Sequence, residues 1–280
     1  MALATLLLFG LVFLREATSP SGAGYWTAMA AAPNGDLYVA DEAHRELRLV
    51  HATGGWERLA GVPQGIFRAL AASGPNLLLA TEGQLYVSND TGTTWRAAIP
   101  GRFTAVAVSG NDEYAGAWSK GLYVSSDAGR SWAKAAVPPG DTQFEAIIPG
   151  YAATLLGLLE TRDSGRTWTR VAGIPDRITA IDTEGGNLVV RAGDWRGVVW
   201  SYDLFRHAVD GSPAFSGGIT AITGPIVATT GGVYPDRPGP LHGREVSRVV
   251  VSDGFYWAAR AKGGVYVADN HLIWRLAYQG

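Results

Sequence analysis

The chain has 280 residues, enough for one large all-β domain or two average ones. Hydrophobic residues make up 47% and charged residues only 17%, which is typical of a folded chain and excludes a disordered one. The formal net charge of -2 offers no basic surface, so no nucleic-acid partner is predicted. The sequence has no cysteine, which excludes disulfides, thiolate metal sites and a cysteine nucleophile.

An apolar run at residues 2–14 opens the chain, interrupted only by Thr5 and Gly10. As a helix it would be about 20 Å long, short of the roughly 30 Å hydrocarbon core of a membrane. That length fits the core of a signal peptide, and the small residues 21–23 would serve as a cleavage site, although no lysine or arginine precedes the run. We expect residues 1–20 to be a membrane anchor or signal segment, with the anchor preferred. Residues 21–280 would then form a domain on the periplasmic or extracellular face.

An eight-residue motif, Ser/Thr-x-Asp-x-Gly-x-Ser/Thr-Trp, recurs at residues 88–95, 125–132 and 161–168. Its aspartates are about 37 residues apart, and such a period indicates a repeat architecture. Weaker copies keep part of the motif: Gly54-Gly55-Trp56, Asp203 with Ala208 in place of tryptophan, Asp236 alone, and Asp269 with Trp274.

A second repeat is a strand-like tetrapeptide with an aromatic or β-branched residue first and alanine third. Its seven copies begin at residues 26, 67, 103, 144, 178, 219 and 246, and only the last replaces alanine, with Arg248. Seven units of about 40 residues predict an all-β, seven-bladed β-propeller of four-stranded antiparallel blades. In the third unit the strands are expected at residues 103–109, 113–118, 121–125 and 131–136. Two β-sandwiches, the alternative, would not give this regular period.

The motif lies at the turn between the third and fourth strands of each unit. Its aspartate can accept backbone hydrogen bonds, its glycine permits a positive φ, and its tryptophan would begin the fourth strand and bury its ring. A catalytic residue need not recur in every blade, so we interpret these residues as structural. The set is Asp90, Trp95, Asp127, Trp132, Asp163, Trp168, Asp203, Asp269 and Trp274.

The repeat resembles the Asp-box, or bacterial neuraminidase repeat, over residues 25–280, strongly at the three full copies and faintly elsewhere. Residues 157–168 are especially similar to repeats of the photosystem II stability and assembly factors. That resemblance implies an exported, non-enzymatic, seven-bladed propeller that binds membrane-protein subunits. Sialidases, xyloglucan hydrolases and sortilin-type receptors carry the same box, so the motif is informative about fold and poor for function.

A sialidase-like site would need clustered arginines and paired carboxylates on the axial face. Candidates there are Arg68, Glu145, Arg177, Asp182 and Arg248. The Arg-Ile-Pro tripeptide usual in sialidases is absent, and solvated charges at the ends of loops remain the simpler interpretation. The five histidines are not at metal-ligand spacing, and no phosphate-binding loop occurs, so neither a metal nor a cofactor is predicted.

Two segments, residues 191–197 and 234–244, depart from the repeat and place arginine and aromatic residues on loops. This composition is common in protein-binding hot spots, although plain loop drift would produce it as well. The partner-binding candidates are Arg191, Trp195, Arg196, Tyr234, Arg237 and Arg244.

These observations favour a non-catalytic accessory, assembly or stabilising subunit. Its propeller would dock on the non-cytoplasmic side of a membrane protein complex, photosynthetic or respiratory. The alternative is an exported glycan-active or glycan-binding protein with an axial pocket.

Overall fold

The computed structural model describes residues 26–41, 44–174, 176–184, 187–192, 198–203, 208–211, 219–223, 226–229, 232–234, 240–260, 263–269 and 274–279. The expected anchor or signal segment, residues 1–20, lies outside these ranges, as does Asp236. Within them the only helix is a 3₁₀ turn at Pro33–Gly35, and no described helix has the length and apolarity to cross a membrane.

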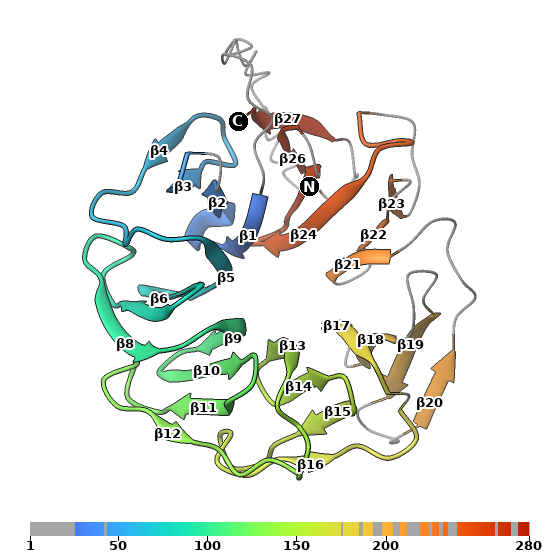
Figure 1. The fold of residues 1–280 in the computed structure, drawn as a ribbon. Coiled ribbons are helices and arrows are strands. Elements are labelled where there is room, and N and C mark those ends of the chain that lie inside the picture. The colour runs from blue at the N-terminus through green and yellow to red at the C-terminus, as the bar shows by residue number, and fades with distance from the viewer. Residues whose placement is uncertain are drawn as a thin grey trace, which may run out of the picture.

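The described strands form seven antiparallel sheets set around a central axis (Figure 1). We call each sheet a blade. The prediction of an all-β chain with four-stranded antiparallel sheets is confirmed, and the arrangement is of the β-propeller type.

Blades 1 to 3 each have four strands. Blade 1 contains β1 (Trp26–Ala31), β2 (Leu37–Asp41), β3 (Glu46–Val50) and β4 (Trp56–Arg58). Blade 2 contains β5 (Phe67–Ser73), β6 (Asn76–Thr81), β7 (Gln84–Ser88) and β8 (Arg96–Pro100). Blade 3 contains β9 (Phe103–Ser109), β10 (Asp112–Ala117), β11 (Gly121–Ser125) and β12 (Ala133–Lys134).

Three of the remaining four blades also have four strands. Blade 4 contains β13 (Phe144–Ile148), β14 (Tyr151–Thr154), β15 (Gly157–Glu160) and β16 (Thr169–Arg170). Blade 5 contains β17 (Ile178–Glu184), β18 (Asn187–Ala192), β19 (Val198–Asp203) and β20 (Ala208–Gly211). Blade 6 contains β21 (Ile219–Thr223), β22 (Ile226–Thr229) and β23 (Gly232–Tyr234), and blade 7 contains β24 (Val246–Ser252), β25 (Phe255–Arg260), β26 (Val265–Ala268) and β27 (Arg275–Tyr278).

The first strands of the blades contact one another in a closed ring, in the order β1, β5, β9, β13, β17, β21, β24 and back to β1. Small residues at the third position let these strands approach, because larger side chains would overpack the ring. The hydrophobic core is divided among the joints between blades. In the joint between blades 3 and 4, for example, Tyr114 and Leu122 pack with Phe144 and Ile147.

Every first strand carries the same β-bulge, which the sequence pattern did not reveal. The first and third residues of the first strand pair with two adjacent residues of the second strand. The residue between them, the second of the first strand, has no pairing partner there. All seven skipped residues are polar: Thr27, Arg68, Thr104, Glu145, Thr179, Thr220 and Ser247. At Thr104 the hydroxyl donates to the carbonyl of Phe144 at 2.6 Å, so the bulge also ties one blade to the next.

Three strands of blade 6 lie within the described residues, and the chain after β23 is described again only from residue 240. Of the loop that follows β23, Leu241 is buried and packs with Ala228, Val246 and Tyr266. The described end of this loop is therefore anchored in the joint between blades 6 and 7.

The ring closes between blade 7 and blade 1 without any exchange of strands, since β1–β4 and β24–β27 form separate sheets. Side chains of blade 7 bond to backbone carbonyls of blade 1. Trp257 Nε1 donates to the Gly35 carbonyl at 3.0 Å, and the Ser252 hydroxyl donates to the Ala32 carbonyl at 2.8 Å. Trp257 is fully buried in this joint, together with Leu37, Val39 and Val265.

Candidate functional site

Antiparallel pairing puts the turns of each blade on two opposite faces. The box face carries the turns between first and second strands and between third and fourth strands. The connector face carries the turns between second and third strands and the links between blades. Hydrogen bonds support this division: in blade 3, the Ala128 N–H of the box turn donates to the Asn111 carbonyl of the turn between β10 and β9.

The three full motif copies lie on the box face and share one hydrogen-bond pattern. In blade 3, Asp127 accepts from the Ser131 amide at 2.9 Å, from the Ser131 hydroxyl at 2.6 Å and from the Ser125 hydroxyl at 2.8 Å. Asp90 and Asp163 accept the corresponding bonds in blades 2 and 4. The carboxylates face their own turns, an arrangement that stabilises the turns.

These donors hold the pKa of all three carboxyl groups below the ordinary value. For Asp127, the Ser131 hydroxyl is the largest cause, followed by the Ser131 amide, and the pKa falls to about 2. The Thr94 hydroxyl and amide lower the pKa of Asp90, and the Thr167 amide and hydroxyl lower that of Asp163. An aspartate whose pKa is lowered in this way is a poor proton acceptor.

The motif tryptophans precede the fourth strands rather than begin them, which corrects the sequence expectation. Each indole N–H donates to the carbonyl of the motif glycine: Trp95 to Gly92, Trp132 to Gly129 and Trp168 to Gly165. Of the three, only Trp168 is buried, with its ring edge-on to Tyr114 at a centroid distance of 6.1 Å.

The weaker motif copies differ from the full ones. Asp203 is the last residue of β19 and pairs with Ala208 of β20, so a strand ladder replaces the box turn in blade 5. Asp269 is exposed after β26, and Trp274 is half-buried against the core of blades 6 and 7.

The axial candidates are spread along the first strands. Arg68 and Glu145 occupy the bulge position of blades 2 and 4, and burial raises the pKa of the Glu145 carboxyl. Arg68 forms an ion pair with Glu82 at 2.5 Å, and Glu82 also pairs with Arg102 at 3.3 Å. Arg68 is therefore engaged with the turn of its own blade on the connector face.

The other three axial candidates lie at different positions along or before their first strands. Arg177 precedes β17, is exposed, has a φ of 58° and donates its amide N–H to the Leu155 carbonyl at 2.9 Å. Asp182 is half-buried at the fifth position of β17. Arg248 takes the third position of β24, where the six other blades have alanine.

Arg248 is both exposed to solvent and partly desolvated. Its side chain is accessible to solvent, yet desolvation by the surrounding protein lowers its pKa.

Three of the six partner-binding candidates, Trp195, Arg196 and Arg237, lie outside the described residues. The backbone of Arg191 pairs with Ala180 and Val199 in blade 5, and that of Tyr234 pairs with Val227 in blade 6. Arg244 is exposed, and its amide N–H donates to the Leu241 carbonyl at 3.2 Å.

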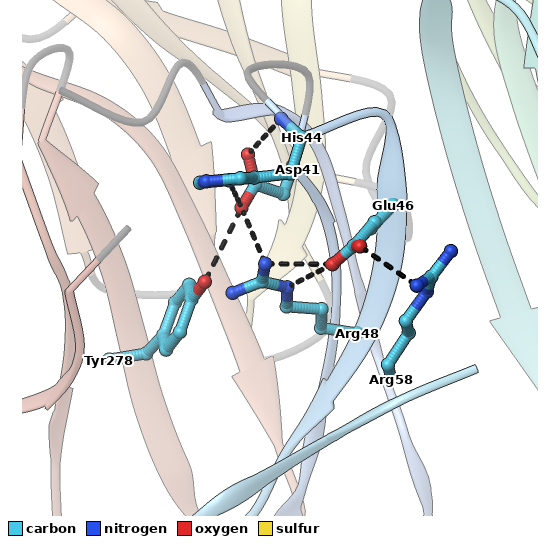
Figure 2. A network of polar contacts seen from close by, with 6 residues as sticks. All are labelled: Asp41, His44, Glu46, Arg48, Arg58 and Tyr278. Atoms are coloured by element: carbon cyan, nitrogen blue, oxygen red, sulfur yellow. Dashed lines mark hydrogen bonds and ion pairs between the residues drawn. The ribbon is translucent and has the colours of Figure 1, made fainter. Parts of the chain in front are cut away.

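A polar network at the junction of blades 1 and 7 was not anticipated. Figure 2 shows Asp41 facing His44, Arg48 and Tyr278. Asp41 is fully buried and accepts from His44 Nδ1 at 2.8 Å and from the Tyr278 hydroxyl at 3.3 Å, while Arg48 lies 3.5 Å away. Glu46 extends the network by pairing with Arg48 and Arg58.

The Arg48 guanidinium also stacks on the rings of Trp56 and Tyr278, with centroid distances of 4.4 and 4.9 Å. Because Tyr278 comes from the last strand and Arg48 from the third, these contacts hold the two ends of the ring together. No strand pattern marks the contacts of Tyr278, since they join residues more than 200 positions apart in the chain.

Exposed apolar side chains gather on the connector face of blades 2 to 4. The described residues include five large hydrophobic side chains that are exposed: Trp56 45%, Ile66 41%, Trp118 40%, Leu155 37% and Leu156 49%. All except Trp56 lie in links or turns of the connector face. Ile66 precedes β5, Trp118 follows β10, and Leu155 and Leu156 join β14 to β15.

Backbone bonds and one cation–π contact hold these positions. The Glu82 amide donates to the Ile66 carbonyl, and the Trp118 amide donates to the Arg102 carbonyl, both at 2.9 Å. The Arg102 guanidinium lies 4.7 Å from the centroid of the Trp118 ring. We call Ile66, Trp118, Leu155 and Leu156 the apolar arc.

A pocket of about 140 Å³ adjoins the end of the apolar arc, lined by residues 140–143 and 154–156. At this pocket the buried Asp141 carboxylate accepts from the Thr154 hydroxyl at 2.7 Å and pairs with Arg170 at 2.5 Å. The pocket therefore combines a satisfied polar floor with an apolar rim of Leu155 and Leu156. Among the described residues no cluster of metal-ligating side chains occurs.

No family model matches the chain, and no curated protein matches it. Solved structures of similar fold include YCF48 bound to a D1 peptide, with 16% identity, a TM-score of 0.59, and 78% of this chain and 82% of that chain covered. The GH74 xyloglucanase from Xanthomonas campestris has 18% identity and a TM-score of 0.56, over 91% of this chain and 45% of that one. A streptogramin B lyase has 10% identity and a TM-score of 0.68, over 90% of this chain and 95% of that one. Likeness at these identities shows the fold alone, and the three proteins include both enzymes and a peptide-bound propeller.

Proposed function

We propose that this chain is a seven-bladed, non-catalytic accessory or assembly subunit that docks through the connector face of blades 2 to 4. Its partner would be a subunit of a membrane protein complex, on the non-cytoplasmic side. The apolar run at residues 2–14 supports the proposed location, and the resemblance of the box repeats to photosystem II stability and assembly factors supports the proposed role.

The observation that carries the proposal is the apolar arc. Scattered exposed apolar residues are normal on a protein surface, but four of the five described ones lie on one face of three consecutive blades. Aromatic residues beside arginine, such as Trp118 under Arg102, are typical of binding hot spots. The arc therefore has the composition expected of a protein-binding surface.

The surface is also rigid, which favours binding. Its turns are fixed by backbone hydrogen bonds to the links between blades, and Glu82 joins Arg68 to Arg102 across the same face. A surface ordered in advance loses little conformational entropy on association. The pocket beside Leu156 would accept one small apolar side chain of the partner. YCF48, a propeller of similar fold, was solved with a D1 peptide, which supports peptide or protein binding by this architecture.

The test is affinity purification of the tagged full-length chain from detergent-solubilised native membranes, followed by quantitative mass spectrometry. We expect one defined set of membrane subunits to be recovered with the native chain. Trp118→Asp and Leu156→Asp place a charge in the apolar arc and should reduce this recovery roughly tenfold or more, because hot-spot substitutions cost over ~1.4 kcal/mol.

The matched control is Ser109→Asp, which adds the same charge at an exposed position on the box face. It should recover the same subunits as the native chain, and all variants should keep the native melting temperature. Equal recovery by Trp118→Asp and the native chain would show that the apolar arc is not the docking surface.

The glycan-active alternative rests on Glu145, whose pKa is raised by burial at the bulge position of β13. A general acid in a glycosidase needs such a raised pKa and a second carboxylate nearby. Incubation with xyloglucan and sialylated glycans would distinguish the two functions. Turnover that is lost in Glu145→Gln would favour the enzyme, and no turnover with intact subunit recovery would favour the accessory protein.

A further inference from the structure

Glu113 on β10 is a buried carboxyl group without a hydrogen-bond partner. Its residue is 0% exposed, and neither carboxyl oxygen has a partner among the described residues. The two other acidic residues buried in the described part of the chain differ from it: Asp41 accepts from His44 and Tyr278, and Asp141 accepts from Thr154 and Arg170. An unpartnered buried carboxyl group costs free energy, most of all when it is ionised.

The position is one that blades 1 and 2 fill with leucine. Counted from the bulge, Glu113 is opposite Val108 of the first strand, as Leu77 is opposite Ala72 in blade 2 and Leu37 is opposite Ala31 in blade 1. Both leucines are fully buried. Blade 3 therefore has a titratable group where blades 1 and 2 have a core hydrocarbon.

Glu113 lies at the joint between blades 2 and 3, against the box turn. A Cβ atom added to Gly129 would lie 2.5 Å from Glu113 Oε2 and 2.8 Å from Cγ2 of Val87 in blade 2. The carbonyl of the same Gly129 accepts from Arg96 Nη2 of β8 at 2.6 Å. The Arg96 guanidinium and the Glu113 carboxyl group thus both contact one glycine, from two different blades.

The charged groups around Glu113 are few. Arg96 approaches from β8 and Asp127 from the box turn, whereas the strands packed directly against it present Val108, Ser125 and Val87, none of which is charged. Burial raises the pKa of Glu113 to about 7, which the charge of Arg96 lowers and that of Asp127 raises. The carboxyl group therefore changes charge in the physiological range.

We propose that Glu113 is a proton-dependent latch between blades 2 and 3. While the carboxyl group is neutral, it fills the leucine position and Arg96 holds the Gly129 carbonyl. When it loses its proton, the carboxylate draws the Arg96 guanidinium away from that carbonyl. The box turn of blade 3 is then released from the outer strand of blade 2, and the rim of the molecule loosens at this joint.

The first test measures the joint itself in the full chain. Amide hydrogen exchange at Gly129, Arg130 and Ser131 is followed from pH 5 to pH 9 and corrected for the intrinsic rate. Protection in the native chain should fall across this range, whereas Glu113→Gln and Glu113→Leu should keep constant protection. Arg96→Gln should show the low protection at every pH, because the bond from Arg96 to the Gly129 carbonyl is absent throughout.

The second test measures linkage to stability. Above pH 7 the unfolding equilibrium constant of the native chain should exceed that of Glu113→Gln by roughly 300-fold, and the two should converge below pH 4.5. Glu57→Gln, at an exposed position on β4, is the matched control and should follow the native chain at each pH.

The Glu113 carboxyl carbon can also be titrated directly by NMR in the native chain, so the proposal does not depend on a variant that folds. A titration midpoint near 4.5, or protection at Gly129 that does not change between pH 5 and pH 9, would overturn the latch. A midpoint near 7 together with pH-dependent protection at Gly129 would establish it.

Discussion

At the scale of single residues, Asp127 and Glu113 of blade 3 show how local partners decide the charge of a carboxyl group. Asp127 lies at the surface with three donors from its own turn, and its pKa falls to about 2. Glu113 lies in the joint below that turn without a donor, and its pKa rises to about 7. The difference between the two comes from their partners and their burial, because both side chains are carboxylic acids.

The hydrogen bonds of Asp127 predict an acid-sensitive contribution to stability. A lowered pKa means that the folded state favours the carboxylate, so the contribution is full above pH 4 and is lost as pH falls toward 2. Asp127→Asn should therefore lower the melting temperature at pH 7, and the gap to the native chain should close near pH 2. Asp112→Asn on β10 is the charge-matched control. A gap that persists unchanged at pH 2 would contradict this account.

At the scale of elements, the repeat period was sufficient to place the first and third strands of the third unit. In the third unit, residues 103–109 and 121–125 are strands as predicted. The fourth strand was predicted at residues 131–136 and covers only Ala133–Lys134. The reason is that Ala136 forms a parallel bridge with Thr167 of blade 4. The chain after Lys134 therefore bonds to the next blade and does not extend the fourth strand of blade 3.

Other features could not be predicted from the sequence. The bulge was not anticipated, because a polar second residue in all seven first strands is compatible with regular pairing as well as with a bulge. Trp118 was predicted to end the second strand and instead lies exposed in the turn that follows. The apolar arc collects residues from one link and two turns, and their presence on one face depends on the ring rather than on any local pattern.

The packing of one blade against the next predicts a steric difference between two glycines. A Cβ atom at Gly116 would lie 2.4 Å from Cβ of Phe144 in blade 4, whereas a Cβ atom at Gly83 would meet nothing within 4 Å. Neither glycine has a positive φ. Gly116→Ala should lower the free energy of unfolding in urea by about 1–3 kcal/mol, the usual cost of overpacking. Gly83→Ala should be neutral within ~1 kcal/mol, and a similar loss at both positions would refute the steric explanation.

At the scale of the whole molecule, the ring is closed by side chains. Blade 7 reaches blade 1 through Trp257, Ser252 and Tyr278, and Arg275 Nη2 donates to the Ala52 carbonyl at 2.5 Å. These bonds replace the shared strand that would otherwise join the two ends of the chain. The closure joint therefore depends on a small number of specific donors.

The Trp257 indole N–H is the most testable of these donors. Trp257→Phe keeps an aromatic ring in the joint but leaves the Gly35 carbonyl without its donor, which should cost about 1–3 kcal/mol of unfolding free energy. Trp132→Phe removes the corresponding bond to Gly129 at the half-exposed rim and should cost less. Denaturant midpoints compare the two, and an equal loss would mean that the closure joint is no more sensitive than the rim.

Separate sheets at the two ends of the chain have a consequence for how the ring can be cut. Because every blade is built from one continuous stretch of chain, a break in any link between blades leaves all seven sheets whole. Circular permutants that join the natural ends and open a link elsewhere would keep the same set of strands in each sheet. The same continuity makes a single blade the natural unit for gene duplication, since one added copy supplies one complete sheet.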